Sequence, residues 1–221
     1  MLNEERLEMT KHNWKQVDAR EFWGKIAPAE HLVQVYDSKE IFLETLTGFV
    51  GTGINAGDSV IIIATSKNLG LLYDRLIGHG ININSLISEN KFIPLNAEEA
   101  LNTFMHNGMP NPDLFDQLIG GLYAKALKGS KKVRAFGELV ALLWENGNRA
   151  GSVKLESLWD HFCRKNALTL FCAYEKSLFK PNTDDYLDGL CLCHTKVIAG
   201  DKKINNAVRY RNTDLNLFEI K

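Results

Sequence analysis

The chain has 221 residues, which is enough for one large domain or two small ones. With 45% hydrophobic residues it can bury a substantial core, which excludes an intrinsically disordered protein. Its 26 basic and 27 acidic residues give a net charge of -1, and this balance does not predict a nucleic-acid interface.

The sequence also predicts neither secretion nor membrane insertion. Its start, MLNEERLEMTKHNW, is polar and of mixed charge, unlike a secretory signal. No apolar run approaches the roughly 18 residues that are needed to span a bilayer. The four cysteines suit reduced thiols in a cytosolic protein. We therefore expect a cytoplasmic protein.

Composition divides the chain into three parts. Residues 1–30 are polar with a few aromatic anchors, and are interpreted as an N-terminal arm or short helix. Residues 31–199 carry the apolar runs of an α/β domain. Residues 200–221 form a polar tail, interpreted either as an edge strand or as a disordered end.

The central part alternates between strand and helix patterns. Near-continuous apolar runs, typical of strands that are covered on both faces, lie at 31–37, 59–65, 91–95, 132–138 and 168–175. Helices are expected from Asp37 with Glu40 as a capping pair, from Ser66, from Asn96 with Glu99 to about 106, from about 114 to 129, and at 139–146, 152–166 and 183–199. The segment 107–113 is a loop by composition.

This alternation predicts a three-layer α/β fold, with a mostly parallel sheet of five or more strands and helices on both faces. Such sheets bind ligands beyond the carboxyl ends of their strands. Polar or aromatic residues at these ends are Tyr36, Asp37, Thr65, Ser66, Asn96, Glu138, Tyr174 and Glu175. Several of them can be helix caps. Glu138 is harder to explain as a cap, because it follows Gly137, precedes an apolar run and would be costly if buried without a partner.

A phosphate-binding loop is absent from the expected place. A nucleoside triphosphatase of this architecture carries G-x-x-x-x-G-K-[ST] after its first strand. Here the first strand continues into VYDSKEIF, and Asp37 would repel a phosphate. The glycine-rich segment 48–58 falls at the other end of the first helix. The sequence therefore argues against ATP hydrolysis of the P-loop type.

Several stretches resemble one known family. They are HLVQVYDSKE, GDSVIIIAT, FIPLNAEEAL, VRAFGELVALLWENGN, LESLWDHF, LFCAYEKSLF and LCHTKV, and they span about 31–198. The chain resembles the MEDS domain, the methanogen/methylotroph sensory domain. The resemblance implies a degenerate RecA/KaiC-like fold without a P-loop. It also implies an input domain that senses small organic molecules, such as hydrocarbon derivatives, and acts on histidine kinases or transcription regulators.

The candidate ligand-binding residues are His31, Tyr36, Asp37, Arg134, Glu138, Trp144, Glu156, Trp159 and Tyr174. Two interpretations of the acids remain open. Glu138 and Glu156 either converge with His31 or Arg134 on a ligand, or belong to a buried network in which Glu138 pairs with Arg134, Arg149 or His31. The aromatic residues either line an apolar pocket or pack in the core.

No metal, cofactor or catalytic residue is assigned. The C-x-C-H motif at 191–194 lacks the second ligand pair of a structural zinc site. The leading hypothesis is a non-enzymatic sensory domain that binds a small organic ligand and signals through a partner protein. The alternatives are a degenerate nucleotide-binding protein or ATPase, in which Glu138 would bind Mg²⁺, and an oligomeric assembly protein that uses residues 1–30 as its linking arm.

Overall fold

The computed structural model describes residues 15–18, 23, 26, 29–179, 194–200 and 207–212. The strands are β1 (Lys15–Asp18), β2 (His31–Tyr36), β3 (Ser59–Ala64), β4 (Phe92–Asn96), β5 (Met105–His106), β6 (Met109–Pro110), β7 (Val133–Gly137), β8 (Thr169–Glu175), β9 (Lys196–Gly200) and β10 (Ala207–Asn212). The helices are α3 (Lys39–Asn55), α4 (Ser66–Gly78), α5 (Ile83–Ser88), α6 (Ala97–Phe104), α7 (Pro112–Ala126), α8 (Leu139–Glu145) and α9 (Arg149–Asn166), with a 3-10 turn η1 (Lys176–Leu178).

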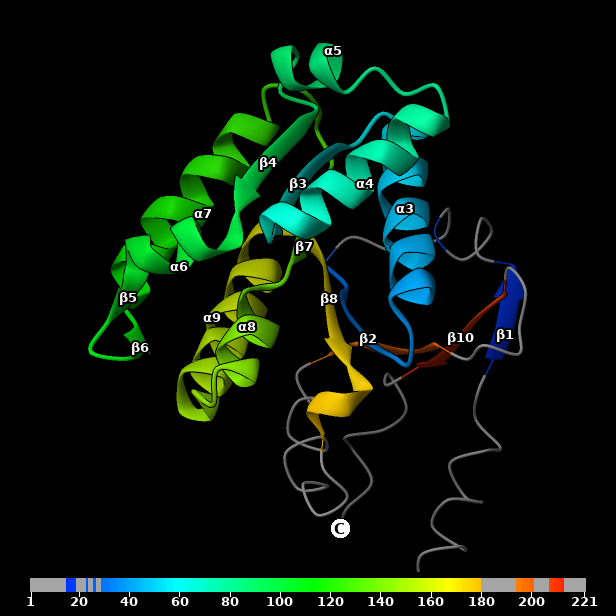
Figure 1. The fold of residues 1–221 in the computed structure, drawn as a ribbon. Helices are drawn as coiled ribbons and strands as arrows, with labels where there is room; N and C mark the ends of the chain where they lie inside the picture. The colour runs from blue at the N-terminus through cyan, green and yellow to red at the C-terminus, as the bar shows by residue number, and fades with distance from the viewer. Residues whose placement is uncertain are drawn as a thin grey trace, which may run out of the picture.

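An eight-stranded sheet organises the fold, with the strand order β1-β10-β9-β2-β8-β7-β3-β4 (Figure 1). The six strands from β9 to β4 pair in parallel, and β10 and β1 continue the sheet antiparallel. The five predicted strands agree with β2, β3, β4, β7 and β8 to within one residue at each end. The predicted mostly parallel α/β fold is confirmed.

Helices cover both faces of this sheet, so that the molecule has three layers (Figure 1). One hydrophobic core lies between the sheet and α3, α4 and α5, and the other lies between the sheet and α6 to α9. Alternation along β3 explains the division, because Val60 and Ile62 belong to the first core whereas Ile61 and Ile63 belong to the second.

The helix starts differ slightly from the predicted ones. The N-cap of α3 is Ser38 rather than Asp37, and that of α4 is Thr65 rather than Ser66. Each hydroxyl accepts a backbone N–H three residues further on, as N-caps do. Asn96 caps α6 as predicted, since its side-chain oxygen accepts the N–H of Glu99 at 2.9 Å.

The largest differences lie near the ends of the chain. The predicted helix 183–199 is wrong over 196–199, which belongs to strand β9, and residues 183–193 lie outside the described residues. Strand β10 lies inside the sheet between β9 and β1, not at its edge. Residues 15–18 of the predicted arm form the edge strand β1. Helix α5 was not predicted.

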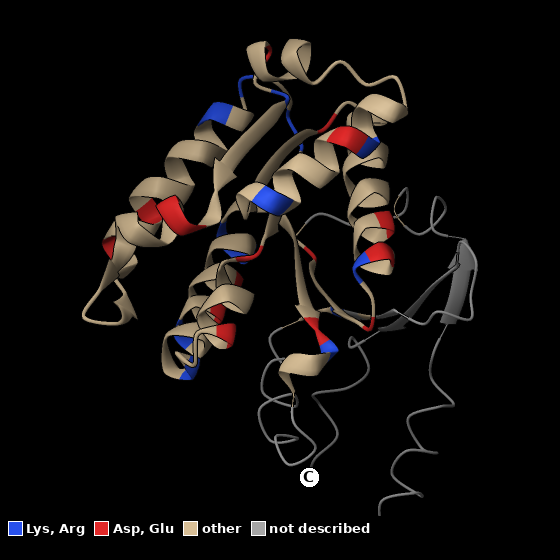
Figure 2. Cartoon of the chain, viewed as in Figure 1, with Lys and Arg blue, Asp and Glu red and all other residues tan. Residues whose placement is uncertain are grey.

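Among the described residues, no helix is both long and apolar enough to cross a membrane. Acidic and basic residues are interspersed along the helices (Figure 2).

Candidate functional site

Glu138 lies at the carboxyl end of β7, where its carboxylate reaches across to the end of β3. Its Oε2 accepts the backbone N–H of Thr65 at 2.7 Å, and its Oε1 accepts the side-chain amide of Asn68. The donors are the N-cap of α4 and a residue of its first turn, and the start of a helix favours a negative charge. Burial raises the pKa of Glu138, while Thr65, Lys39 and Asn68 act in the opposite direction.

This arrangement gives Glu138 a structural role, because it joins β7 to the start of α4. The partners are a backbone N–H and an amide, and not Arg134, Arg149 or His31. The predicted ion-pair network around Glu138 is therefore wrong. The carboxylate nevertheless keeps its position at the edge of the sheet, with 8% of the residue exposed to solvent.

Two further ionisable groups lie near Glu138, at the end of β2. Tyr36 is buried and stacks on Phe42 with ring centroids 4.9 Å apart. Burial raises the pKa of Tyr36, and the charge of Glu138 raises it further. Lys39, the first residue of α3, lies over the Phe42 ring at 4.6 Å. Burial lowers the pKa of Lys39, whereas Glu138 raises it. A carboxyl group, a phenol and an ammonium group thus influence one another at this edge.

Three other predicted site residues have separate surroundings. Asp37 forms an ion pair of 3.2 Å with Lys176 at the surface. Trp144 is buried on α8, where its Nε1 donates to a backbone carbonyl in η1 at 3.4 Å and the guanidinium of Arg149 lies 5.3 Å from its ring. Trp159 is buried in the second core and meets the ring of Phe115 edge to face at 5.1 Å. These contacts match the core-packing interpretation of the two tryptophans.

Arg134 lies at the amino end of β7, at the opposite end of that strand from Glu138. Its Nε and Nη2 donate to Asp58 Oδ2 at 2.9 and 2.5 Å, and its Nη1 donates to the carbonyl of Phe49 at 3.1 Å. Both side chains of the pair are only 9% exposed. Arg134 therefore does not converge with either glutamate on a ligand. It is half of a buried ion pair between β7 and the turn before β3.

The remaining predicted residues meet in a second, fully buried cluster. Glu156 Oε1 accepts the hydroxyl of Tyr174 at 2.5 Å, and Glu156 Oε2 lies 3.5 Å from His31 Nε2. Cys172 and His194 complete the cluster: Cys172 Sγ is 3.5 Å from His31 Nε2, and His194 Nε2 is 3.7 Å from Glu156 Oε1. His31 and Glu156 therefore lie side by side, whereas Glu138 and Arg134 lie outside this cluster.

Sheet pairing explains how this cluster forms from distant segments. Strand β2 lies between β8 and β9, and Val33 pairs with Cys172. The backbone N–H of Thr195 donates to the carbonyl of His31 at 2.7 Å, which places His194 beside the start of β2. The two imidazole rings have centroids 4.0 Å apart. Glu156 comes from the buried side of helix α9, which packs against the sheet.

Sequence reasoning missed Lys39, Asn68, Cys172 and His194. Lys39 could have been identified as a candidate site residue, because it lies only two residues beyond Asp37 and therefore close to the carboxyl end of the first strand. Only the three-dimensional pairing brings Cys172 to His194. The four side chains His31, Glu156, Cys172 and His194 offer ligand atoms that all lie within 4.8 Å of one another, so they could hold a metal ion.

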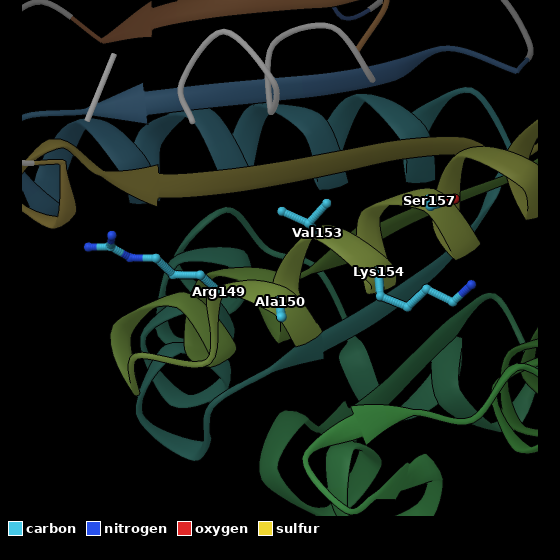
Figure 3. A pocket seen from close by; sticks show the side chains of 5 residues that line it. All are labelled: Arg149, Ala150, Val153, Lys154 and Ser157. Atoms are coloured by element: carbon cyan, nitrogen blue, oxygen red, sulfur yellow. The ribbon is translucent and has the colours of Figure 1, made fainter. Parts of the chain in front are cut away.

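A surface depression of about 520 Å³ lies along the exposed side of α9 (Figure 3). Its lining is formed by Arg149, Ala150, Val153, Lys154 and Ser157. All five side chains come from one helix, and none of them is a predicted ligand-binding residue. The depression is therefore separate from both the carboxyl edge and the buried cluster.

Two solved structures share the fold. The chain is similar to the protein PH0250 from Pyrococcus horikoshii OT3, with a TM-score of 0.55 and 11% identity over 84% of this chain and 89% of that one. It is also similar to the KaiC-like protein PH0186 from the same archaeon, with a TM-score of 0.54 and 13% identity over 88% and 83%. At these identities the likeness concerns the fold alone. Comparison with curated proteins gives no match.

A family model matches most of the chain. It describes the MEthanogen/methylotroph, DcmR Sensory domain and aligns with residues 30–195. That range holds β2 to β8 with their helices, the carboxyl edge around Glu138 and all four side chains of the buried cluster. The expected resemblance is confirmed, and the chain belongs to the MEDS family of sensory domains.

Proposed function

We propose that this chain is an input domain that binds a small organic molecule at the carboxyl edge of its sheet, beside Glu138. The observation that carries the proposal is the meeting of Glu138, Lys39 and Tyr36 at the ends of β7 and β2. Open α/β sheets bind their ligands at this edge. Groups whose pKa values are displaced by burial and by one another are typical of functional sites.

The chemistry of these groups favours a ligand with a polar head and a small apolar body. Glu138 accepts hydrogen bonds when it is ionised, whereas Lys39 and Tyr36 donate them. The Tyr36 ring and the aliphatic stem of Lys39, which both pack on the fully buried Phe42, supply an apolar surface. A short alcohol, a hydroxy acid or a halogenated hydrocarbon meets this description, and such molecules are within the hydrocarbon derivatives that the family resemblance implies.

Signalling would follow from the structural role of Glu138. The same carboxylate joins β7 to the start of α4, and α8 begins directly after it. A ligand that competes for this carboxylate would favour a different arrangement of α4 and α8. We infer that a cytoplasmic partner, such as a histidine kinase or a transcription regulator, binds differently to the two arrangements. Alternatively, the change alters contacts between copies of this chain in a homo-oligomer.

A thermal-shift screen tests the proposal. The purified chain is mixed with small organic acids, alcohols and halogenated hydrocarbons, and a ligand at about 100 times its Kd stabilises the fold by about 2.7 kcal/mol. The Glu138→Gln variant should lose the response without losing its fold, because Asn68 can turn its free Oδ1 toward the new amide. The exposed control Glu44→Gln should respond like the wild type. An equal response of Glu138→Gln and the wild type would contradict the proposed site.

One observation supports the alternative of a degenerate nucleotide-binding protein. Lys39 follows the first parallel strand closely and lies near an acidic side chain at the end of β7. Against this alternative, no glycine loop precedes Lys39, and Ser38 already caps the helix end that would receive a phosphate. Nucleotides with and without Mg²⁺ therefore form the second half of the screen. A Mg²⁺-dependent shift that is lost in Lys39→Met would favour this alternative.

A further inference from the structure

We propose that His31, Glu156, Cys172 and His194 form a binding site for a divalent transition-metal ion of the zinc class. The four side chains come from four separate segments, namely β2, α9, β8 and the residue pair before β9. No spacing motif in the sequence links them, and His194, the histidine of the C-x-C-H motif, is the part of that motif that the structure describes. This site is independent of the ligand site proposed at the carboxyl edge.

The donor atoms select the class of ion. Two imidazole nitrogens, one sulfur and one carboxylate oxygen form a mixed set that suits zinc and its neighbours, whereas magnesium and calcium prefer sites made entirely of oxygen. With both histidines neutral, the thiolate and the carboxylate together neutralise a divalent cation. Neutrality matters here, because each of the four residues is at most 2% exposed and an uncompensated charge would be costly.

Three of the distances between donor atoms match those of tetrahedral coordination, and all four ligand atoms lie within 4.8 Å of one another. Bonds of about 2.0–2.3 Å to zinc place neighbouring ligand atoms about 3.3–3.8 Å apart in a tetrahedron. In the cluster, His31 Nε2 is 3.5 Å from both Cys172 Sγ and Glu156 Oε2, and His194 Nε2 is 3.7 Å from Glu156 Oε1. Small rotations of the side chains would bring all four donors to one ion.

The surroundings of the acid support the same assignment. Tyr174 donates to Glu156 Oε1 and fixes the orientation of the carboxylate, as outer partners of metal ligands do. Glu156 Oε2 accepts no hydrogen bond from any described residue, although it is completely buried. A metal ion bound here would supply a partner for this oxygen, because carboxylates and thiols bind metals in their deprotonated forms.

Four protein ligands would leave no open position, which is typical of a structural site rather than a catalytic one. The metal would join α9 to three adjacent strands and would hold the start of β9 against β2. Because all four side chains are buried, metal binding would be coupled to the folding of the chain. The ion would thus act as a structural link on one side of the sensory domain.

The test uses the full chain refolded in the presence of Co²⁺, which replaces zinc and absorbs visible light. We expect one tightly held Co²⁺ per chain, with intense tetrahedral d–d bands and a near-ultraviolet band from thiolate-to-cobalt charge transfer. Cys172→Ser should abolish the charge-transfer band, and Tyr174→Phe should weaken Co²⁺ binding by about 10–100-fold. Zn²⁺ should displace Co²⁺ and raise the melting temperature above that of the metal-free protein.

Two controls separate this site from other thiols. Cys163 is also buried on α9 but lies outside the cluster, so Cys163→Ser should keep the charge-transfer band. A double variant with serine in place of Cys191 and Cys193 should keep it as well. Loss of the band in that double variant, with retention in Cys172→Ser, would overturn the proposal in favour of a local C-x-C-H chelate. Failure of the wild type to retain Co²⁺ would overturn it directly, without reference to the folding of any variant.

Discussion

Replacing Glu138 by alanine would test whether this carboxylate holds the carboxyl end of β7 to the start of α4. The substitution removes the acceptor of two hydrogen bonds, one from the N–H of Thr65 and one from the amide of Asn68. A hydrogen bond to a charged group contributes about 1.5–3 kcal/mol, so the gross loss is about 3–6 kcal/mol. Removing a buried carboxylate also removes its desolvation cost, which offsets part of this loss. We expect a net decrease of about 2–4 kcal/mol in the free energy of unfolding.

Equilibrium denaturation in urea measures this difference, provided that the slope of the transition stays unchanged. Glu145→Ala is the matched control, because Glu145 lies on the exposed side of α8, and its effect should stay within about 0.5 kcal/mol. Glu138→Gln should behave more like the wild type than Glu138→Ala. A loss below about 1 kcal/mol in Glu138→Ala would refute the structural role that we derive from the two hydrogen bonds.

Three further predictions concern stability. Asp58→Ala leaves the buried guanidinium of Arg134 without its partner and should cost about 3–5 kcal/mol in urea denaturation, whereas Glu40→Ala, which breaks an exposed pair, should cost about 1 kcal/mol or less. Burial raises the pKa of Glu156 above 4.5, so its contribution to stability is complete below that pH and is lost as pH rises through the folded-state pKa. From pH 4.5 to neutrality, the free energy of unfolding should therefore fall less in Glu156→Gln than in the wild type. Equal pH profiles of the two proteins would contradict this. Asn96→Ala removes the cap of α6 and should lower the free energy of unfolding by about 1 kcal/mol, which circular dichroism during denaturation can follow.

The central sheet could be predicted from the sequence because its strands are covered on both faces. A run such as SVIIIAT predicts a strand in the middle layer, since apolar side chains on both faces of the strand must be covered by helices on both faces of the sheet. Strand β9 was missed for the opposite reason. Its sequence, KVIAG, is short, and it follows a stretch whose apolar spacing suggested a helix.

The site was predictable only where position along one strand decides it. Glu138 could be placed correctly, because it comes directly after the last residue of β7. The expected pairing with Arg134 fails on simple geometry, because four residues of an extended strand span about 13 Å. The meeting of His31, Glu156, Cys172 and His194 depends on which strands are neighbours in the sheet. The spacing of residues within one segment of the sequence does not determine the order of the strands in a parallel sheet.

The position of β2 also has a consequence for how the chain assembles. This strand is the first of the parallel set to leave the ribosome, yet its two neighbours are β8 and β9, and the contact between His31 and Thr195 joins residues 164 positions apart. Such distant pairing is slow to form, because long loops must close before any contact is gained. During synthesis the backbone N–H and C=O groups along both edges of β2 therefore stay unpaired while β3, β4 and β7 can already pair with one another. We expect a late folding step, and a need for chaperones, to centre on this first strand.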